Sequence, residues 1–281
     1  MDFTTIATGY SFAEAPRVAD DGTVYFSDLL GGGYHRCRPG MPVDTILPDR
    51  VWIGGAVLDA SGSIVCGGKG GLVWVDPETR QVTPILSEIG GRPIVAVNDI
   101  EADARGGIFG GTVDFVAIFE RGETPTNGQF FHLAPHGEVR VLREGLVASN
   151  GLGFSPDRRR LYHSESTRGI WVYALGPDGM PGAPEMFAKL DDCDGLAVDS
   201  EGAVWVACWR SAELHRFRAD GSLERTVSLP FANLVSVAFG GADLHQLYVS
   251  TGDTADRKGG VVRIRVDVPG QREFKSKLGG A

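Results

Sequence analysis

A motif of about forty residues recurs along this chain. Its clearest copy begins at Asp194 and reads "DGLAVDSEG", "AVWVACW", "ELHRFRADG" and "SLERTVSLP". That order is a strand, a glycine turn, a second strand, a short link, a third strand, an "ADG" turn and a fourth strand. Each copy therefore predicts a meander of four short antiparallel strands.

The same opening recurs at five other points. Gly202 lies eight residues after Asp194, and three other copies carry a glycine at that place: Gly22, Gly62 and Gly106. The copy at Asn150 has a longer turn, from Pro156 to Arg160. The six leading residues are Glu14, Gly54, Asn98, Asn150, Asp194 and Ser236, at spacings of 40, 44, 52, 44 and 42 residues.

Six such units predict an all-β fold. We expect a six-bladed β-propeller with four antiparallel strands per blade, formed by residues 1–281 as a single domain with a metal ion in its central channel. Runs of strand length such as "TVYFSD" and "GIWVYAL" lie between glycine-rich turns, and helical periodicity is nearly absent. A β-sandwich with chance similarity is the alternative, and the internal period argues against it.

The net charge and the hydropathy of the chain limit the classes of molecule that it can bind. The chain has 27 Lys and Arg against 36 Asp and Glu, a net charge of -9, which disfavours nucleic acid and anionic lipid. We find no signal-like N-terminus and no run of about 18 apolar residues, so we expect a cytoplasmic protein without a membrane segment. The four cysteines form no Cys-x-x-Cys pair, and we expect most of them to be core thiols. A propeller closes its own sheets, so we expect a monomer that acts on a small molecule.

The leading residues are also candidates for chemistry, because equivalent positions of successive blades form a ring around the channel. Four of them carry carboxylate or amide oxygens: Glu14, Asn98, Asn150 and Asp194. Taken singly, such residues are usually turn formers. Two carboxylates that converge repel each other, and a divalent cation between them removes the conflict. Oxygen ligands suit Ca²⁺, Mg²⁺ or Mn²⁺, open positions also admit Zn²⁺ or Fe²⁺, and we favour Ca²⁺ or Zn²⁺.

A family resemblance rests on six segments in order: "FAEAPRV", "VND", "GGTV", "SNGLGFSPD", "DGLAVDSEGAVWVACW" and "VAFGGADLHQLYVST". Over about residues 10–268 the chain resembles the gluconolactonase, regucalcin (senescence marker protein) and luciferin-regenerating enzyme family. The resemblance implies a six-bladed propeller with one divalent metal ion in the channel and hydrolysis of a lactone.

The resemblance also implies roles for individual residues. Glu14, Asn150 and Asp194 would be the metal ligands. Asn98 would contact the substrate or a water molecule on the metal, or the metal itself, as the corresponding asparagine does in related phosphotriesterase propellers. Many sugar lactonases of the family carry an arginine where this chain has Ala96, so we expect a substrate less polar than a simple sugar lactone. Residues 112–128 lie where the family places a lid, and we expect Phe115 and Phe119 to bind substrate if they face the channel.

These features predict a metal-dependent lactonase. A metal ion would stabilise the oxyanion that forms when water attacks the lactone carbonyl, and Asp194 would take the proton from the water. His163 or Glu165 would serve instead if the blade turned them inward, although strand pairing favours a structural role for both. Two alternatives stay open: a phosphotriesterase of the diisopropylfluorophosphatase kind, with the same four polar residues, and a non-catalytic, metal-stabilised binding propeller.

Overall fold

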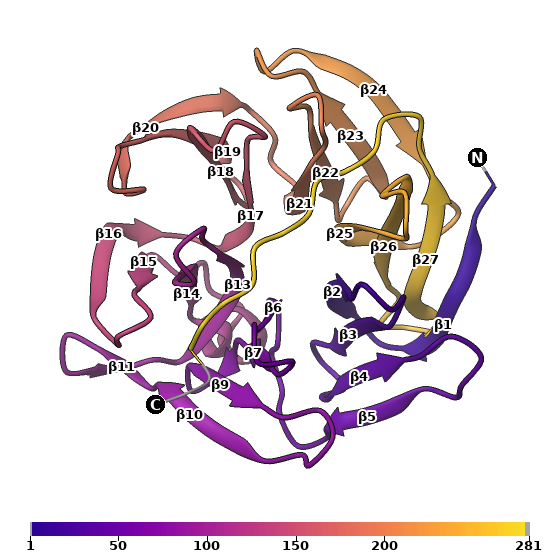
Figure 1. Ribbon diagram of the computed structural model, residues 1–281, viewed down its shortest axis with the longest axis horizontal. Helices are drawn as coiled ribbons and strands as arrows, with labels where there is room; N and C mark the ends of the chain where they lie inside the picture. The colour runs from indigo at the N-terminus through magenta and orange to yellow at the C-terminus, as the bar shows by residue number, and fades with distance from the viewer. Residues whose placement is uncertain (1, 279–281) are drawn as a thin grey trace.

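The computed structural model describes residues 2–278, so residues 1 and 279–281 of the predicted 1–281 domain lie outside the described residues. Six sheets surround a central channel (Figure 1). Blade one consists of β2 (Ala13–Val18), β3 (Val24–Asp28), β4 (Tyr34–Cys37) and β5 (Asp44–Leu47). Blade two consists of β6 (Ala56–Leu58), β7 (Ile64–Cys66), β9 (Leu72–Val75) and β10 (Val82–Leu86). Blade three consists of β13 (Ala96–Ala102), β14 (Ile108–Val113), β15 (Gly128–Leu133) and β16 (Val139–Leu146).

The second half of the chain repeats this order. Blade four consists of β17 (Ser149–Phe154), β18 (Arg160–Glu165), β19 (Gly169–Leu175) and β20 (Pro181–Ala188). Blade five consists of β21 (Cys193–Val198), β22 (Val204–Cys208), β23 (Glu213–Phe217) and β24 (Leu223–Ser228). Blade six consists of β25 (Asn233–Gly240), β26 (Gln246–Gly252), β27 (Gly259–Arg265) and β1 (Thr4–Tyr10). The prediction of six blades with four antiparallel strands each is confirmed.

Four short elements lie outside this scheme. Strand β8 (Gly68–Lys69), in the link between β7 and β9, pairs with β13 of the next blade. Strands β11 (Glu88–Ile89) and β12 (Arg92–Pro93) form a small hairpin. A π-helical turn, η1 (Val116–Arg121), follows β14. None of the described helices is long and apolar enough to cross a membrane.

Blade six combines strands from the beginning and the end of the propeller sequence. Its outermost strand is β1, which pairs antiparallel with β27, Ala7 opposite Val261. The pairing joins the start of the chain to a strand about 250 residues later and closes the ring (Figure 1). The repeat did not predict this strand, because β1 precedes the first copy of the motif.

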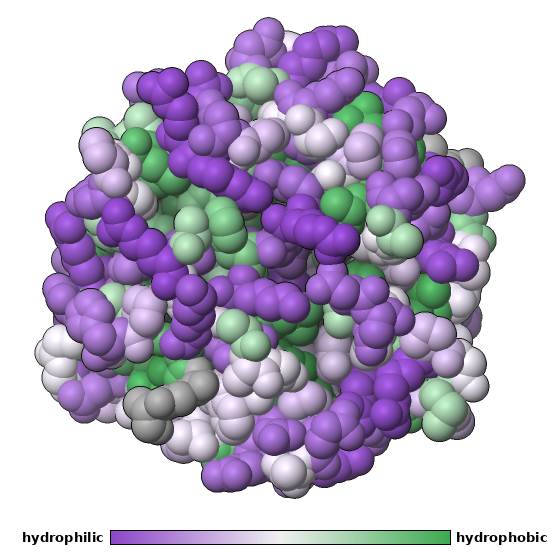
Figure 2. Space-filling model, viewed as in Figure 1, coloured by the Kyte–Doolittle hydropathy of each residue, from purple (hydrophilic) through white to green (hydrophobic). Residues whose placement is uncertain are grey.

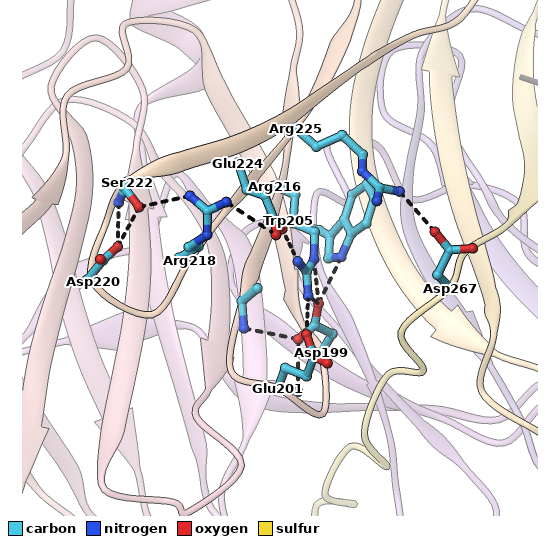
Figure 3. Close-up of polar contacts among 11 residues, drawn as sticks. Asp199, Glu201, Trp205, Arg216, Arg218, Asp220, Ser222, Glu224, Arg225 and Asp267 are labelled. Atoms are coloured by element: carbon cyan, nitrogen blue, oxygen red, sulfur yellow. Dashed lines mark hydrogen bonds and ion pairs between the residues drawn. The ribbon is translucent and has the colours of Figure 1, made fainter.

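The conserved spacing within each repeat copy has a structural cause at the first turn. The glycine eight residues after the leading residue adopts a positive φ, 83° at Gly202 and 93° at Gly62, which only glycine adopts at no steric cost. In blade five Asp199 accepts hydrogen bonds from the backbone N–H groups of Glu201 and Ala203. Its other oxygen accepts from Trp205 Nε1 at 3.2 Å and from the guanidinium of Arg216 (Figure 3).

Buried side chains pack between neighbouring blades. One cluster joins Trp205 and Leu214 of blade five to Val237 and Leu247 of blade six. The cysteines take part in this packing as free thiols: three are buried and Cys37 is half-buried. The prediction of core thiols is therefore confirmed.

The C-terminal segment, residues 269–278, crosses one end of the channel (Figure 1). The backbone N–H of Ser200 donates to Pro269, and Asp59 accepts hydrogen bonds from Ser276 Oγ and the N–H of Leu278. Asp59 and Asp199 lie at the ends of innermost strands opposite to the leading residues, so the tail covers the end away from the predicted site. The face that it crosses is mostly hydrophilic in Figure 2.

Candidate metal centre

The four polar leading residues converge on one cavity of about 310 Å³. They come from the starts of four innermost strands, β2, β13, β17 and β21: Glu14, Asn98, Asn150 and Asp194. Each is buried, with exposed fractions between 4% and 7%. The structure therefore brings together the side chains that the repeat placed on one ring.

The two carboxyl groups are held in an environment that disfavours their charge. Burial, followed by the negative charges of Asp194 and Asp99, raises the pKa of Glu14 well above its usual range. Burial, then Asp99 and Asp192, does the same to the pKa of Asp194. Glu14 Oε2 has no hydrogen-bond partner within the described residues. Since buried charges are normally paired, these groups need either protons or a cation.

Glu14 forms no ion pair among the described residues, and the buried guanidinium of Arg17 pairs with other carboxylates. Arg17, deeper in the channel, donates to the carbonyl of Ile100 at 3.1 Å and to Glu101 at 3.2 Å. Its Nε also lies 3.4 Å from Glu273 of the C-terminal segment. Burial raises the pKa of the intervening Asp99 to about 7 against the opposing charge of Arg17. The cationic group is therefore engaged at the far end of the channel.

The two amides are linked to each other. Asn98 Nδ2 donates to the carbonyl of Ser149 at 2.7 Å and to Asn150 Oδ1 at 2.5 Å. Asn150 Nδ2 donates to Ser166 Oγ at 2.6 Å. Both N–H groups of Asn98 are thus used within the protein, which leaves Oδ1 as its free polar atom toward a ligand.

Two backbone features shape the ring. Ala15, next to Glu14, has φ 49°, a left-handed conformation that is uncommon for a residue with a side chain and is found preferentially at functional sites. At Gly54 a Cβ would collide with Oδ1 of Asn98. The leading residue of blade two therefore supplies space for Asn98 and no ligand.

This donor set fits a divalent cation. Two buried carboxylates that form no ion pair among the described residues, together with amide oxygen, match the oxygen ligands that such ions prefer. In the part of the chain that the structure describes, no group of three or more His, Cys, Asp or Glu side chains is placed to hold a metal ion. A cation bound here would therefore need the amide oxygens in addition to the two carboxylates.

The rest of the cavity wall is mainly apolar. Its described lining residues include no lysine or arginine. The apolar ones are Phe12, Leu29, Phe115, Ile118, Phe119, Pro125, Val147, Ala148 and Trp209. Phe115 and Phe119 stack with ring centroids 5.1 Å apart, and Trp52 packs on the other side of Phe115 at 5.8 Å. Phe115 is buried, whereas Phe119 is 44% exposed at the rim.

The segment predicted as a lid has a defined conformation. The backbone N–H of Ala117 donates to Asp114 at 2.9 Å, and Gly122 ends η1 in the left-handed region. Phe115 and Phe119 both line the cavity, as expected if the segment faced the channel. Ala96 is buried in the cluster that contains Trp52 and Phe115, so it contributes to the support of this wall.

Neither alternative base lines the cavity. His163 is buried in blade four, where Nε2 lies 2.7 Å from Ser149 Oγ, and burial together with Arg143 lowers its pKa to about 3. Glu165 is fully buried and contacts Arg143 at 3.0 Å, Arg168 at 3.1 Å and Trp171 Nε1 at 2.9 Å. These contacts occupy both carboxylate oxygens, and a role in stabilising the blade explains both residues.

Sequence reasoning missed several residues of the site. Ser166 and Thr167, which follow β18, line the cavity, as do Phe12 and Trp209. Ser166 and Thr167 lie outside the repeat positions and the family segments, whereas Phe12 and Trp209 are the end residues of two of those segments and were not singled out. Their presence depends on how the loops between strands fold over the channel entrance.

Comparison with known proteins gives a consistent result. The model of the "SMP-30/Gluconolactonase/LRE-like region" matches residues 12–253. A pentonolactonase from Haloferax volcanii is 31% identical over an alignment of 281 residues that covers 92% of each chain. A 6-deoxy-6-sulfogluconolactonase from Pseudomonas putida is 28% identical, with 89% of each chain covered. The structure of a calcium-binding protein, regucalcin, from Agrobacterium tumefaciens superposes with a TM-score of 0.86 at 21% identity, covering 98% of each chain.

Proposed function

This chain belongs to the SMP-30/gluconolactonase/LRE-like family, and on that premise we propose that it is a metal-dependent hydrolase that opens a lactone. The observation that carries the proposal is the convergence of two amides and two buried carboxyl groups on one cavity, where neither carboxyl has an ion-pair partner among the described residues. The names of the relatives, a pentonolactonase and a sulfogluconolactonase, support the reaction class.

Glu14, Asn150 and Asp194 would hold the cation. When bound, a divalent cation supplies Lewis acidity that polarises an ester carbonyl and favours negative charge on its oxygen. Asn98 supports the ligand set through its hydrogen bond to Asn150 Oδ1 and presents its own Oδ1 to the substrate. Which cation occupies the site is left to experiment, with Ca²⁺ and Zn²⁺ favoured.

Asp194 is the proposed base. It takes a proton from the water whose oxygen forms a bond to the lactone carbonyl carbon. The ring C–O bond then breaks, and Asp194 returns the proton to the leaving alkoxide, which gives a free hydroxy acid. The apolar walls exclude bulk water from the reacting ester, which strengthens electrostatic interactions at the site.

The cavity wall favours an apolar substituent on the lactone. Phe115, Ile118 and Phe119 offer hydrocarbon surface, and no lysine or arginine among the described lining residues offers a charge to a sugar carboxylate, phosphate or sulfonate. We therefore expect alkyl-substituted lactones to be better substrates than simple sugar lactones. The monomeric state and the cytoplasmic location stay predictions from the sequence.

The test is proton release during lactone hydrolysis by chelator-stripped protein. Ca²⁺, Mn²⁺, Zn²⁺, Fe²⁺ or Mg²⁺ is restored singly, and sugar lactones are compared with alkyl lactones. Asp194→Ala should lower turnover by about 10²–10⁴-fold. Asp199→Asn, at the other end of the same strand and outside the cavity, is the control for general damage and should retain turnover.

Other outcomes would assign one of the alternatives. Faster turnover of an organophosphate than of any lactone would favour the phosphotriesterase. Metal binding that raises stability, with no turnover of either substrate class, would favour a non-catalytic binding propeller.

A further inference from the structure

A series of hydrogen bonds runs behind the proposed ligands across three blades. Asn98 from blade three donates to Asn150 of blade four, and Asn150 donates to Ser166 Oγ. Ser166 Oγ in turn donates to the carbonyl of Cys193 at 2.6 Å. Cys193 directly precedes Asp194, so the series links three of the four polar residues of the site.

The direction of each bond is determined by its chemistry. The Cys193 carbonyl can only accept, so the single Ser166 hydroxyl hydrogen is used on it. The oxygen of Ser166 must therefore accept from Asn150, and only the NH₂ end of that amide can donate. An amide has one NH₂ end and one oxygen end, and this contact places Oδ1 on the side of Asn98 and the cavity.

We propose that Ser166 is a positioning residue that orients Asn150, so that its amide oxygen is available as a cation ligand. The inference rests on the proposed metal site. Asn98 Nδ2 donates to the same Oδ1, so Ser166 and Asn98 hold the amide from its two ends. Without the Ser166 hydroxyl, only the Asn98 contact opposes a turn of the amide that presents its NH₂ group, which repels a cation. The hydroxyl of Ser166 therefore selects the productive orientation of Asn150 before any ion arrives.

The backbone around Ser166 holds the hydroxyl in place. Its N–H donates to the carbonyl of Ala148, and the N–H of Thr167 donates to Asp191 at 2.8 Å. Thr167 has φ 73°, a left-handed conformation that is unfavourable for a β-branched residue. Ser166 is therefore anchored to the strand entrances of blades four and five, which carry Asn150 and Asp194.

The experiment measures the affinity of chelator-stripped protein for Ca²⁺ and for Zn²⁺ by calorimetry. Ser166→Ala should weaken the affinity by about tenfold or more, the usual effect of removing a group that orients a ligand. Ser166→Thr keeps the hydroxyl and should retain affinity. Ser166→Cys, with a weak sulfur acceptor, should be intermediate, and it also serves if the alanine variant does not fold.

Ser250→Ala is the matched control. Ser250 is also a buried serine on an innermost pair of strands, and it hydrogen-bonds only to the backbone of Ser236. Its loss should lower thermal stability and leave metal affinity unchanged. Equal metal affinity of wild type, Ser166→Ala and Ser250→Ala would overturn the proposal.

The Ser166→Ala substitution in an Asn150→Asp variant tests whether Ser166 acts by orienting the amide. Asn150→Asp supplies two equivalent oxygens, so it needs no orientation, and Ser166→Ala should then change metal affinity little. The same loss of affinity in both backgrounds would show that Ser166 does not act through the amide. Wild-type protein that binds none of the metals would refute the proposed function itself, whereas binding that is insensitive to Ser166→Ala refutes only this inference.

Discussion

The carboxylate of Asp194, from blade five, raises the pKa of Glu14, from blade one, although the two residues are 180 positions apart in the chain. Burial is the larger cause of the raised pKa of Glu14, and it outweighs the hydrogen bond from the backbone N–H of Ala15, which acts in the opposite direction. In the metal-free protein the carboxyl groups of Glu14 and Asp194 therefore tend to be protonated. Cation binding must remove those protons, because the ionised carboxylates are the ligands.

The first prediction concerns proton release. Cation binding to chelator-stripped protein should release protons, and the affinity should rise with pH until the raised pKa values are passed. Calorimetry in buffers of different ionisation enthalpy measures the number released. Glu14→Gln should release fewer protons and bind more weakly, and binding without proton release at every pH at which the protein is folded would contradict the prediction.

The same groups predict how the apo protein responds to pH. Because the folded-state pKa of Glu14 and Asp194 is raised, the folded protein binds more protons than the unfolded chain above the ordinary carboxyl range. Their contribution to the free energy of unfolding should therefore fall as pH rises through that window. A saturating divalent cation should remove this dependence.

His163 should make the free energy of unfolding decrease as the pH falls, which is opposite in sign to the effect of Glu14 and Asp194. Its folded-state pKa is lowered to about 3, so between the ordinary histidine range and pH 3 the unfolded chain binds one more proton. Stability should be lost as pH falls, by about 1.4 kcal/mol per pH unit. Urea titrations at pH 7, 6 and 5 should show that His163→Gln removes this part of the slope, and identical slopes in both proteins would refute the assignment.

Substitutions at Ala96 should change the preference between sugar lactones and alkyl lactones. An arginine there would meet the cluster of Trp52 and Phe115, and Ala96→Arg alone should lower stability by about 3 kcal/mol or more through overpacking and burial of a charge. Combined with Phe115→Ala, it should raise kcat/KM for sugar lactones relative to alkyl lactones. Phe115→Ala alone is the control, and it should reduce turnover of alkyl lactones without helping sugar lactones.

Phe119 predicts where an alkyl substituent binds. Phe119→Ala removes the exposed half of the stacked pair with Phe115 and should raise KM for long alkyl lactones by about tenfold, with little change for an unsubstituted lactone. Leu223→Ala, an exposed apolar residue of β24 outside the cavity, should change neither value. An equal rise in KM for all lactones would place the substituent elsewhere.

Removal of strand β1 should destabilise the propeller, because β1 closes the ring of blades. Deletion of residues 2–10 should lower the free energy of unfolding by at least about 3 kcal/mol, because it uncovers buried side chains packed against Val261 and exposes the edge of β27. Thermal unfolding and light scattering would measure the loss and the resulting association. Unchanged stability would mean that β1 does not hold blade six closed.

Several features of the fold could be predicted because the blade is a local unit. The repeat spacing, and glycines such as Gly202 at turns that require a positive φ, depend on residues within one blade. A propeller converts such periodicity into a ring, so the convergence of Glu14, Asn98, Asn150 and Asp194 also followed from the sequence. Their roles as ligands and base stay predictions until cation binding is measured.

The sequence by itself determined the number of blades, the four-strand order of the repeat and the residues that face the channel entrance. Tertiary structure alone decided that β1 completes blade six, that Gly54 makes room for Asn98, and that Ser166 reaches Asn150. It also removed His163 and Glu165 from the site by burying them within blade four. The physical reason is that a repeat pattern reports contacts between residues of one meander, which are close in the sequence. The features decided by the tertiary structure depend on contacts between segments far apart in the sequence, and on which atom of each hydrogen bond is the donor.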